Sequence, residues 1–487
     1  MSNLKQLKLL LCLIVIALCS CSRDEAITEN PTVTEEGASV TFRLQSNVTA
    51  VLTRGVEESG ETDLGTADES KVKSARVYFF DNNSKQRVKD VLVNTFKIQT
   101  SADFSATYET DVIKIEPGVY DIFVVANSNR IINGDTENEF LADIDSVTYK
   151  QGKIEDISNG IVMSNRGTAN LGVKIEKRDE TEVNIVTVLL ERVLARLDVA
   201  EAKEKFELIE EGKTDPYATV TMNGYYIVNV PKYYYTYRHK AVLTSLIEPT
   251  WDINTHFGNI EPTEENAYVI DPYFFKKKVD ASKFTNQDQY YAYYAGDLTN
   301  PVWASIGLTP TTTYSLENCM IADAQKNGYS TGIVFKAKVE PNKNVYRLNG
   351  DNLELITDPT QYPEEIYYCN HRFFNSLEAM ENYMSTLPQS TALHINSQKF
   401  VKVGGDYTCY YNYWIKHLDN NNNYVMGVME FGIVRNNLYK IKVTDITDLG
   451  YGPDPNIVPD TRDEDDAKLK VLLNVKKWVV RELNIVL

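Results

Sequence analysis

A succession of short β-type segments separated by turn residues most constrains the fold of this chain. One such segment, Ala75–Phe80, runs into Asp81–Ser84, a cluster of turn-forming residues. Another begins at the turn Pro117–Gly118 and continues through residues of high β propensity to Asn127. Repeated strands with turn signals between them are typical of β-sandwiches. The pattern therefore predicts an all-β fold with few short helices.

Two other segments do not show a clear strand pattern: one is ambiguous between helix and strand, and the other is predicted to be a helix. Val188–Val199 mixes apolar and charged residues, and its periodicity leaves helix and strand both open. A helix is predicted after Asn375, which can act as its N-cap because Glu378 follows at capping-box spacing. The apolar residues of that helix share one face: Leu377, Met380, Met384 and Leu387.

The N-terminus has the pattern of a bacterial lipoprotein signal. A short basic start precedes an apolar core, Leu9–Leu18, which is too short to span a bilayer as a helix. Leu18-Cys19-Ser20-Cys21 then reads as a lipobox, with Cys21 as the residue to be acylated. Cys19 is the poorer acceptor, because bulky Leu18 would directly precede it. We therefore expect a signal peptide over residues 1–20 and lipid on Cys21.

A second processing site is indicated further along. Val40, Phe42 and Leu44 alternate with polar residues, which is the period of a half-buried strand. That strand runs into Leu52-Thr53-Arg54-Gly55, where a lone basic residue precedes a flexible glycine. A strand placed directly upstream of a trypsin-like site suggests that the strand is removed after cleavage. The alternative is that Arg54 is an ordinary loop arginine.

Composition narrows the class of protein. A length of 487 residues suggests two to three domains, and 43% hydrophobic residues with 31 Tyr support a large core. A net charge of −18 argues against a nucleic-acid partner, because phosphates would be repelled. No stretch after Leu18 is apolar for long enough to form a transmembrane helix. Three cysteines follow the predicted lipidation site, which allows one disulfide at most: Cys319, Cys369 and Cys409.

Signatures of catalysis and of metal binding are missing from the sequence. The histidines are scattered without metal-ligand spacing, and there is no Gly-x-Ser-x-Gly elbow or phosphate-binding loop. Asp419–Asn423 alternates oxygen ligands but lacks the glycine and the closing Glu of a calcium loop, so a turn is favoured. We therefore expect no enzyme activity, no metal and no cofactor.

Several blocks of the chain resemble the fimbrillins, the type V pilus subunits of anaerobic Gram-negative bacteria. The most specific block contains Arg435-Asn436-Asn437 followed by Tyr439, which we interpret as a structural hairpin corner whose Asn side chains bond the backbone. The C-terminal half is most similar to the minor-fimbrium stalk type of subunit. The blocks that carry the resemblance are Ser74–Asp81, Gly118–Asn127, Leu190–Asp198, Gly432–Ile441 and the final Trp478-Val479-Val480.

The resemblance implies a domain plan and a maturation route. The plan is a signal peptide (1–20), a propeptide (21–54) and two transthyretin-like β-sandwich domains in tandem, which we place at 55–200 and 201–487. An Arg-specific protease would cut after Arg54, so that Gly55 starts the mature chain and the strand of Val40, Phe42 and Leu44 is lost. The groove left behind would accept a strand from another subunit.

The C-terminus supplies a candidate for the inserted strand. Leu483, Ile485 and Leu487 alternate with Asn484 and Val486, which repeats the apolar spacing of the strand to be removed. We expect this segment to be the donor strand of a head-to-tail polymer. The alternative is a terminal strand of its own domain.

The function implied is that of a structural stalk subunit of a cell-surface fimbria, supporting adhesion and biofilm formation. Its precursor would be an outer-membrane lipoprotein, and its partners would be further copies of itself, accessory anchor and tip subunits, and the protease. An anchor subunit, which would keep its lipid and lack the Arg cut, and a tip subunit, which would lack a usable donor strand, remain alternatives. A glycan-binding surface lipoprotein is another, with tyrosines that stack on sugars: Tyr233–Tyr237, Tyr290–Tyr294 and Tyr407–Tyr413.

Overall fold

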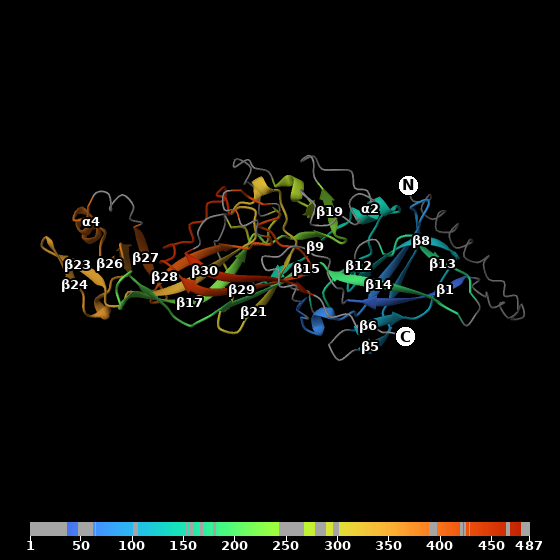
Figure 1. The fold of residues 1–487 in the computed structure, drawn as a ribbon, viewed down its shortest axis with the longest axis horizontal. Helices are drawn as coiled ribbons and strands as arrows, with labels where there is room; N and C mark the ends of the chain where they lie inside the picture. Colours follow the sequence, from blue (N-terminus) through green and yellow to red (C-terminus); the bar gives the residue numbers. More distant parts are fainter. Residues whose placement is uncertain are drawn as a thin grey trace, which may run out of the picture. The chain divides into compact units, whose positions relative to one another are not determined.

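The protein is an all-β protein with few short helices, as the sequence predicts (Figure 1). Contacts gather Ala38–Leu487 into one compact unit. No helix in the described part of the chain is long and apolar enough to cross a membrane. The computed structural model describes residues 37–46, 62–63, 65–100, 106–150, 153–154, 157, 159–165, 169–178, 182–242, 267–277, 289–295, 301–388, 397–418, 422, 425–427, 429–463 and 468–478.

A ten-stranded sheet is built from the N-terminal part of the chain. Its edges are β4 and β5, and β1 lies in its interior. The path of the sheet is β4 (Arg87–Val93), β3 (Ala75–Asp81), β8 (Gly118–Ala126), β12 (Met163–Asn165), β14 (Asn184–Arg192), β1 (Ala38–Gln45), β6 (Ala106–Thr110) and β5 (Phe96–Thr100), with β13 (Val173–Ile175) on β8 and β7 (Ile113–Ile115) on β1.

This sheet folds over on itself to enclose a core. Phe42 in β1 meets Phe79 in β3, four strands further along the sheet, with ring centroids 5.8 Å apart in an edge-on arrangement. Val77 and Ile122 are buried in the same cluster as Val188 from β14. Strands that are distant in the sheet thus pack face to face, which is the arrangement of a β-sandwich.

Two further sheets enclose the second core. They comprise a five-stranded sheet, which contains β15 and β29, and a nine-stranded sheet, which contains β17, β22 and β28. The first is β2 (Thr62–Asp63), β30 (Leu469–Trp478), β29 (Asn437–Ile446), β15 (Leu194–Glu201) and β21 (Thr311–Leu316). The second is β16 (Phe206–Ile209), β17 (Pro216–Val228), β22 (Gly332–Glu340), β28 (Asp406–Trp414), β27 (Gln398–Val403), β25 (Glu365–Cys369), β26 (Arg372–Phe374), β23 (Val345–Asn349) and β24 (Asn352–Leu355).

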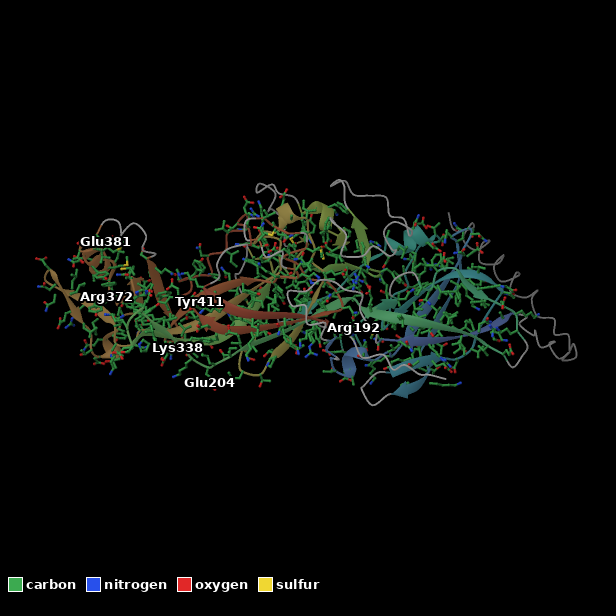
Figure 2. All side chains as sticks on the ribbon, viewed as in Figure 1. Arg192, Glu204, Lys338, Arg372, Glu381 and Tyr411 are labelled. Atoms are coloured by element: carbon green, nitrogen blue, oxygen red, sulfur yellow. The ribbon has the colours of Figure 1, made fainter. Side chains whose placement is uncertain are left out.

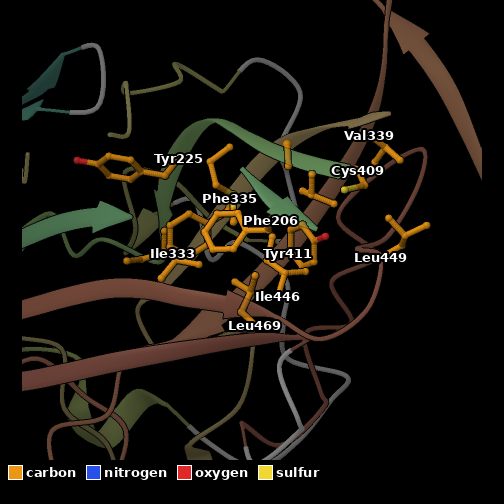
Figure 3. Close-up of a cluster of buried hydrophobic side chains, with 14 of the residues drawn as sticks. Phe206, Tyr225, Ile333, Phe335, Val339, Cys409, Tyr411, Ile446, Leu449 and Leu469 are labelled. Atoms are coloured by element: carbon orange, nitrogen blue, oxygen red, sulfur yellow. The ribbon is translucent and has the colours of Figure 1, made fainter. Parts of the chain in front are cut away.

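The core between these sheets is aromatic and aliphatic. Figure 3 shows Phe206, Phe335 and Tyr411 gathered with Ile446 and Leu469, which come from strands on both sides of the layer. All five side chains are buried, and burial raises the pKa of the Tyr411 phenol well above its usual value. Such close packing of large side chains fixes the relation of the two sheets.

The segment whose periodicity was ambiguous forms two strands in two different sheets. β14 ends at Arg192 and β15 begins at Leu194, so the chain passes from the ten-stranded to the five-stranded sheet at Val193. β15 is buried along most of its length and the last three residues of β14 are all buried, so the alternation seen earlier in β14 does not continue through Val188–Val199. The tandem-domain boundaries stay a prediction.

The predicted helix exists, but its cap lies one residue later than expected. The N-cap of α4 (Leu377–Ser385) is Ser376, whose Oγ accepts a hydrogen bond from the Ala379 N–H at 3.2 Å. Asn375 is therefore not the cap. Met380 is buried on the inner face as predicted, but Leu377 is exposed.

The remaining elements are short. In the described part of the chain a further α-helix, α2 (Glu137–Leu141), starts at a capping box formed by Thr136 and Glu139. Three two-stranded pairs are β10 (Tyr149–Lys150) with β11 (Lys153–Ile154), β18 (Tyr233–Tyr235) with β9 (Ile144–Ser146), and β19 (His239–Val242) with β20 (Ala267–Ile270). Single-turn helices among the described residues are η1 (Asp68–Ser70), η2 (Phe274–Lys276), η5 (Ala322–Ala324) and η6 (Pro359–Gln361).

Candidate assembly site

The strand predicted to be removed, β1, is an interior strand of the ten-stranded sheet. On one side it runs parallel to β14, with Phe42 opposite Val186 and Leu44 opposite Val188. On the other side it runs antiparallel to β6 and β7, and Leu44 lies opposite Tyr108. Figure 1 shows β14, β1 and β6 side by side. Taking β1 away would therefore expose the backbone edges of strands on both sides.

The two faces of β1 differ as the sequence alternation predicts. Val40, Phe42 and Leu44 have no exposed surface, and all three belong to the core of the ten-stranded sheet. Arg43 faces outward, where its Nε lies 2.9 Å from Glu109 Oε2 in a partly exposed ion pair. Thr41 is also buried, which the alternation did not predict. Without β1 the core would keep an apolar groove three side chains long.

Polar side chains from neighbouring strands also hold β1. The Phe42 N–H donates to Thr110 Oγ1 at 3.0 Å, and Asn184 Nδ2 donates to the Ser39 carbonyl at 2.9 Å. Tyr108 is buried beside β1, and this burial raises the pKa of its phenol. These contacts make β1 an integral strand of the ten-stranded sheet.

The chain that joins β1 to the rest of the protein contains the predicted cleavage site. β1 ends at Gln45 and the next strand, β2, begins at Thr62. Arg54 and Gly55 lie between them, outside the described residues, as does Cys21 further upstream. By connectivity alone, one cut after Arg54 would leave β1 attached only to the propeptide.

The chain after the predicted cut is anchored by η1. Arg192, which is fully buried at the end of β14 (Figure 2), donates from Nη2 to Ser70 Oγ at 2.7 Å and from Nε to the Glu69 carbonyl at 2.9 Å. The Glu69 carboxylate in turn lies 3.0 Å from Arg196 Nη1 and accepts the Tyr314 hydroxyl at 2.6 Å. Cleavage upstream would leave this anchor intact.

The Arg435-Asn436-Asn437 block is structural, as interpreted, although it is not a hairpin corner. It precedes and begins β29. Asn437 Nδ2 donates to the carbonyls of Val434 and Arg435, while the buried Arg435 pairs with Glu317 at 2.7 Å. Burial raises the pKa of Glu317, and the nearby Arg435 and Arg238 oppose that shift. No local pattern in the sequence predicts this buried charge pair, because its two members come from distant segments.

The predicted donor strand follows β30. β30 pairs antiparallel with β29, and its last two residues pair with β2, Thr62 opposite Lys477 and Asp63 opposite Trp478. Leu483, Ile485 and Leu487 lie beyond β30, outside the described residues. The segment after the predicted cut and the segment before the predicted donor are thus hydrogen-bonded neighbours.

The other candidate groups have mainly packing roles in the structure. The tyrosine clusters place six phenols in the interior: Tyr234, Tyr235, Tyr237, Tyr291, Tyr407 and Tyr411. Cys319, Cys369 and Cys409 are buried free thiols. Within the described residues no three His, Cys, Asp or Glu side chains form a group able to hold a metal ion, and most of Asp419–Asn423 lies outside that part of the chain.

Comparison with known families supports the sequence resemblance. Residues 38–192 match the family described as major fimbrial subunit protein (FimA). Residues 405–484 match the family described as major fimbrial subunit protein type IV, fimbrillin, C-terminal. No relative among curated proteins matches.

Solved structures also align with most of the chain. A fimbrilin (fimA) from Porphyromonas gingivalis is 16% identical over 92% of this chain and 100% of its own, with a TM-score of 0.41. A putative cell adhesion protein from Parabacteroides distasonis is 14% identical over 92% and 98%, with a TM-score of 0.42. The tip fimbrial protein Mfa3 from Porphyromonas gingivalis, with a C-terminal truncation, is 13% identical over 90% of this chain and 100% of its own, with a TM-score of 0.36.

The all-β fold and the family matches define a structural subunit of cell-surface fimbriae. More specifically, the chain belongs to the fimbrillin family.

Proposed function

We propose that this chain is a polymerising stalk subunit whose β1 is released by cleavage after Arg54 and replaced by the C-terminal segment of the next subunit. The observation that carries the proposal is the position of β1. It is an interior strand with three fully buried apolar side chains, yet its covalent link to the remaining sheet passes through the segment that contains Arg54.

Strand replacement has a sufficient driving force. Burying Val40, Phe42 and Leu44 contributes roughly 1.5–3 kcal/mol per side chain, so an empty groove is strongly unfavourable. Each backbone hydrogen bond to the neighbouring strands adds about 1 kcal/mol net. A donor with the same apolar spacing, such as Leu483, Ile485 and Leu487, would recover both contributions.

The exchange has the geometry of a filament. The groove lies in the ten-stranded sheet, whereas the donor follows β30 in the five-stranded sheet. Two different surfaces would therefore meet in each contact, and a heterologous contact that does not close into a ring propagates as a fibre. Adhesion and biofilm formation would follow from the polymer, and accessory anchor and tip subunits would complete it.

Mass spectrometry of the N-terminus of surface-purified protein tests the proposal. We expect filaments whose subunits begin at Gly55, together with a precursor that begins at an acylated Cys21. Filament-associated protein that still begins at lipidated Cys21 would instead identify an anchor subunit. A mature terminus after Arg23 or Arg43 would refute the assigned cut.

Export as a lipoprotein is tested separately. Cys21→Ala should abolish labelling by a fatty-acid probe and leave unprocessed precursor behind, because the acylated thiol is missing. Cys19→Ala is the matched control and should be exported normally. Continued labelling and surface delivery of Cys21→Ala would refute the assigned lipid site.

A further inference from the structure

A lysine, an aspartate and an asparagine meet in the interior, away from the assembly site. Lys277 follows η2, Asp271 follows β20, and Asn318 follows β21. Lys277 Nζ lies 2.5 Å from Asp271 Oδ2 and 2.8 Å from Asn318 Oδ1, and it also donates to the Cys319 carbonyl at 2.8 Å. The three residues are at most 5% exposed.

Neighbouring groups fix the orientation of both acceptors. Asn318 Nδ2 donates to the Tyr329 carbonyl at 2.7 Å and to Thr331 Oγ1 at 2.9 Å, which turns Oδ1 of the same amide toward Lys277. Asp271 Oδ2 accepts the Cys319 N–H at 2.7 Å, so its carboxylate is held beside the amine. The amine, carboxylate and carboxamide are therefore preorganised, not drawn together by flexible side chains.

The surroundings exclude water. The Tyr291 hydroxyl lies 3.5 Å from Asn318 Oδ1, and Tyr291 is itself buried, which raises the pKa of its phenol well above its usual value. Phe274, Met320 and Tyr329, which neighbour these residues in the chain or accept their hydrogen bonds, are buried as well. In such a site a buried ammonium–carboxylate pair carries a large desolvation cost. A reaction that consumes the ammonium removes that cost, and with water excluded, hydrolysis does not compete at the carboxamide carbon.

We propose that Lys277 and Asn318 form an intramolecular amide crosslink, with Asp271 as the proton carrier. Asp271 Oδ2 takes a proton from Lys277 Nζ, and the neutral amine attacks Asn318 Cγ. The new Nζ–Cγ bond forms, Asp271 passes the first proton to Asn318 Nδ2 as the Cγ–Nδ2 bond breaks, and the carboxylate then accepts the second proton that the newly bonded Nζ gives up. An amine and a primary amide thus become a secondary amide and ammonia, with no oxidant or reductant needed.

The distance supports this step. Nζ is 2.8 Å from Oδ1, and since a C=O bond is about 1.23 Å long, Nζ lies within about 4 Å of Cγ. A modest side-chain rotation brings reacting atoms from such a separation into a near-attack arrangement. The product would tie the segment that carries β20 and η2 to the strand end after β21, in a subunit meant to bear tension. The proposal does not depend on strand exchange.

The test is the mass of the folded wild-type protein and of its tryptic peptides. We expect the intact mass to fall short of the sequence by one ammonia, and a branched peptide in which Lys277 is joined to the peptide containing Asn318. Trypsin should not cleave after Lys277, because its amine is acylated. An intact mass equal to the sequence overturns the proposal. So does an ammonia deficit located in a linear peptide, which would indicate a succinimide.

Matched variants separate the reaction from simple burial. Lys277→Arg keeps a buried cation without a nucleophilic amine, and Asn318→Ala removes the electrophile, so neither should show the deficit. Asp271→Asn keeps Lys277 and Asn318 but removes the proton carrier, and it should remain largely uncrosslinked while circular dichroism shows a folded protein. Full crosslinking in folded Asp271→Asn would overturn the role of Asp271.

Discussion

Asn436 Oδ1 accepts hydrogen bonds from both the backbone N–H and the guanidinium of Arg192, at 3.4 and 3.3 Å, across 244 positions of sequence. The backbone of Asn436 has a φ of +58°, a conformation that Asn tolerates better than most residues. Two family-like sequence blocks, one in each half of the chain, are thereby joined in a single buried contact.

This contact predicts that two substitutions of Asn436 lower the free energy of unfolding by different amounts. Asn436→Gly keeps the left-handed backbone but removes the acceptor, and should lower the free energy of unfolding by about 1–3 kcal/mol. Asn436→Ala also strains the backbone and should be less stable still, by about 1 kcal/mol. Urea denaturation of the precursor measures both, and wild-type stability for Asn436→Gly would show that the contact is dispensable.

Cleavage is predicted to depend on Arg54 alone. Arg54→Ala and Arg54→Lys should both stay full length in the presence of the Arg-specific protease and should remain monomeric, because β1 still fills its groove. Arg43→Ala is the control, since Arg43 lies on the outer face of β1 in an ion pair that contributes little. Filaments assembled from uncut Arg54→Ala would contradict the mechanism.

The C-terminal segment is predicted to matter for the polymer and not for the monomer. Ile485→Asp should stop polymerisation, because a carboxylate would be buried in the groove without a partner, at a cost of several kcal/mol. Deleting residues 483–487 should do the same, and Asn484→Asp, on the opposite face, should not. Electron microscopy scores filaments, and a large fall in the melting temperature of the monomer would mean that the segment belongs to its own domain.

A pH dependence follows from Glu137, whose side chain is buried beside Asp121 and Lys85. Burial, followed by the hydrogen bond and charge of Asp121, raises the pKa of Glu137 from 4.5 to about 8. The folded state thus binds the extra proton between these values, and stability should fall as the pH rises through this window, on the order of 5 kcal/mol in total.

Glu137→Gln should remove this slope while leaving stability near pH 5 almost unchanged. Glu139→Gln, on the same short helix, is the control, because hydrogen bonds from the Thr136 and Asp135 backbone lower the pKa of that exposed carboxyl. Thermal melts from pH 5 to pH 8.5 measure the slope. An identical pH profile for wild type and Glu137→Gln would contradict the assignment.

Much of the strand content could be predicted from local pattern. Ala75–Phe80 and the run after Gly118 became β3 and β8, because turn residues bound them and their residue types favour strands. The strand at Val40, Phe42 and Leu44 was visible for the same reason. Local sequence also located α4. Ser376 and Asn375 are both residue types that favour the N-cap position, so local sequence alone does not decide that Ser376 is the cap.

The rest depends on contacts that local pattern does not encode. The parallel pairing of β1 with β14 joins residues about 145 positions apart, as the hydrogen bond from Asn184 to Ser39 shows. Buried charges such as Arg192 and Arg435 look like surface residues in the sequence, because their partners come from distant segments. The cluster of Lys277, Asp271 and Asn318 is hidden for the same reason.

The most direct test of strand exchange is a cysteine pair, Ile485→Cys with Val186→Cys. Val186 lies opposite Phe42, at the centre of the groove, so the central donor residue should reach it whichever way the donor runs. Adding Leu487→Cys with Val188→Cys reports the direction, since that pair forms only if the donor runs as β1 does. Each single-cysteine variant serves as a control for the buried native thiols. Strand exchange predicts disulfides between successive subunits in filaments, whereas disulfides confined within single subunits would contradict it.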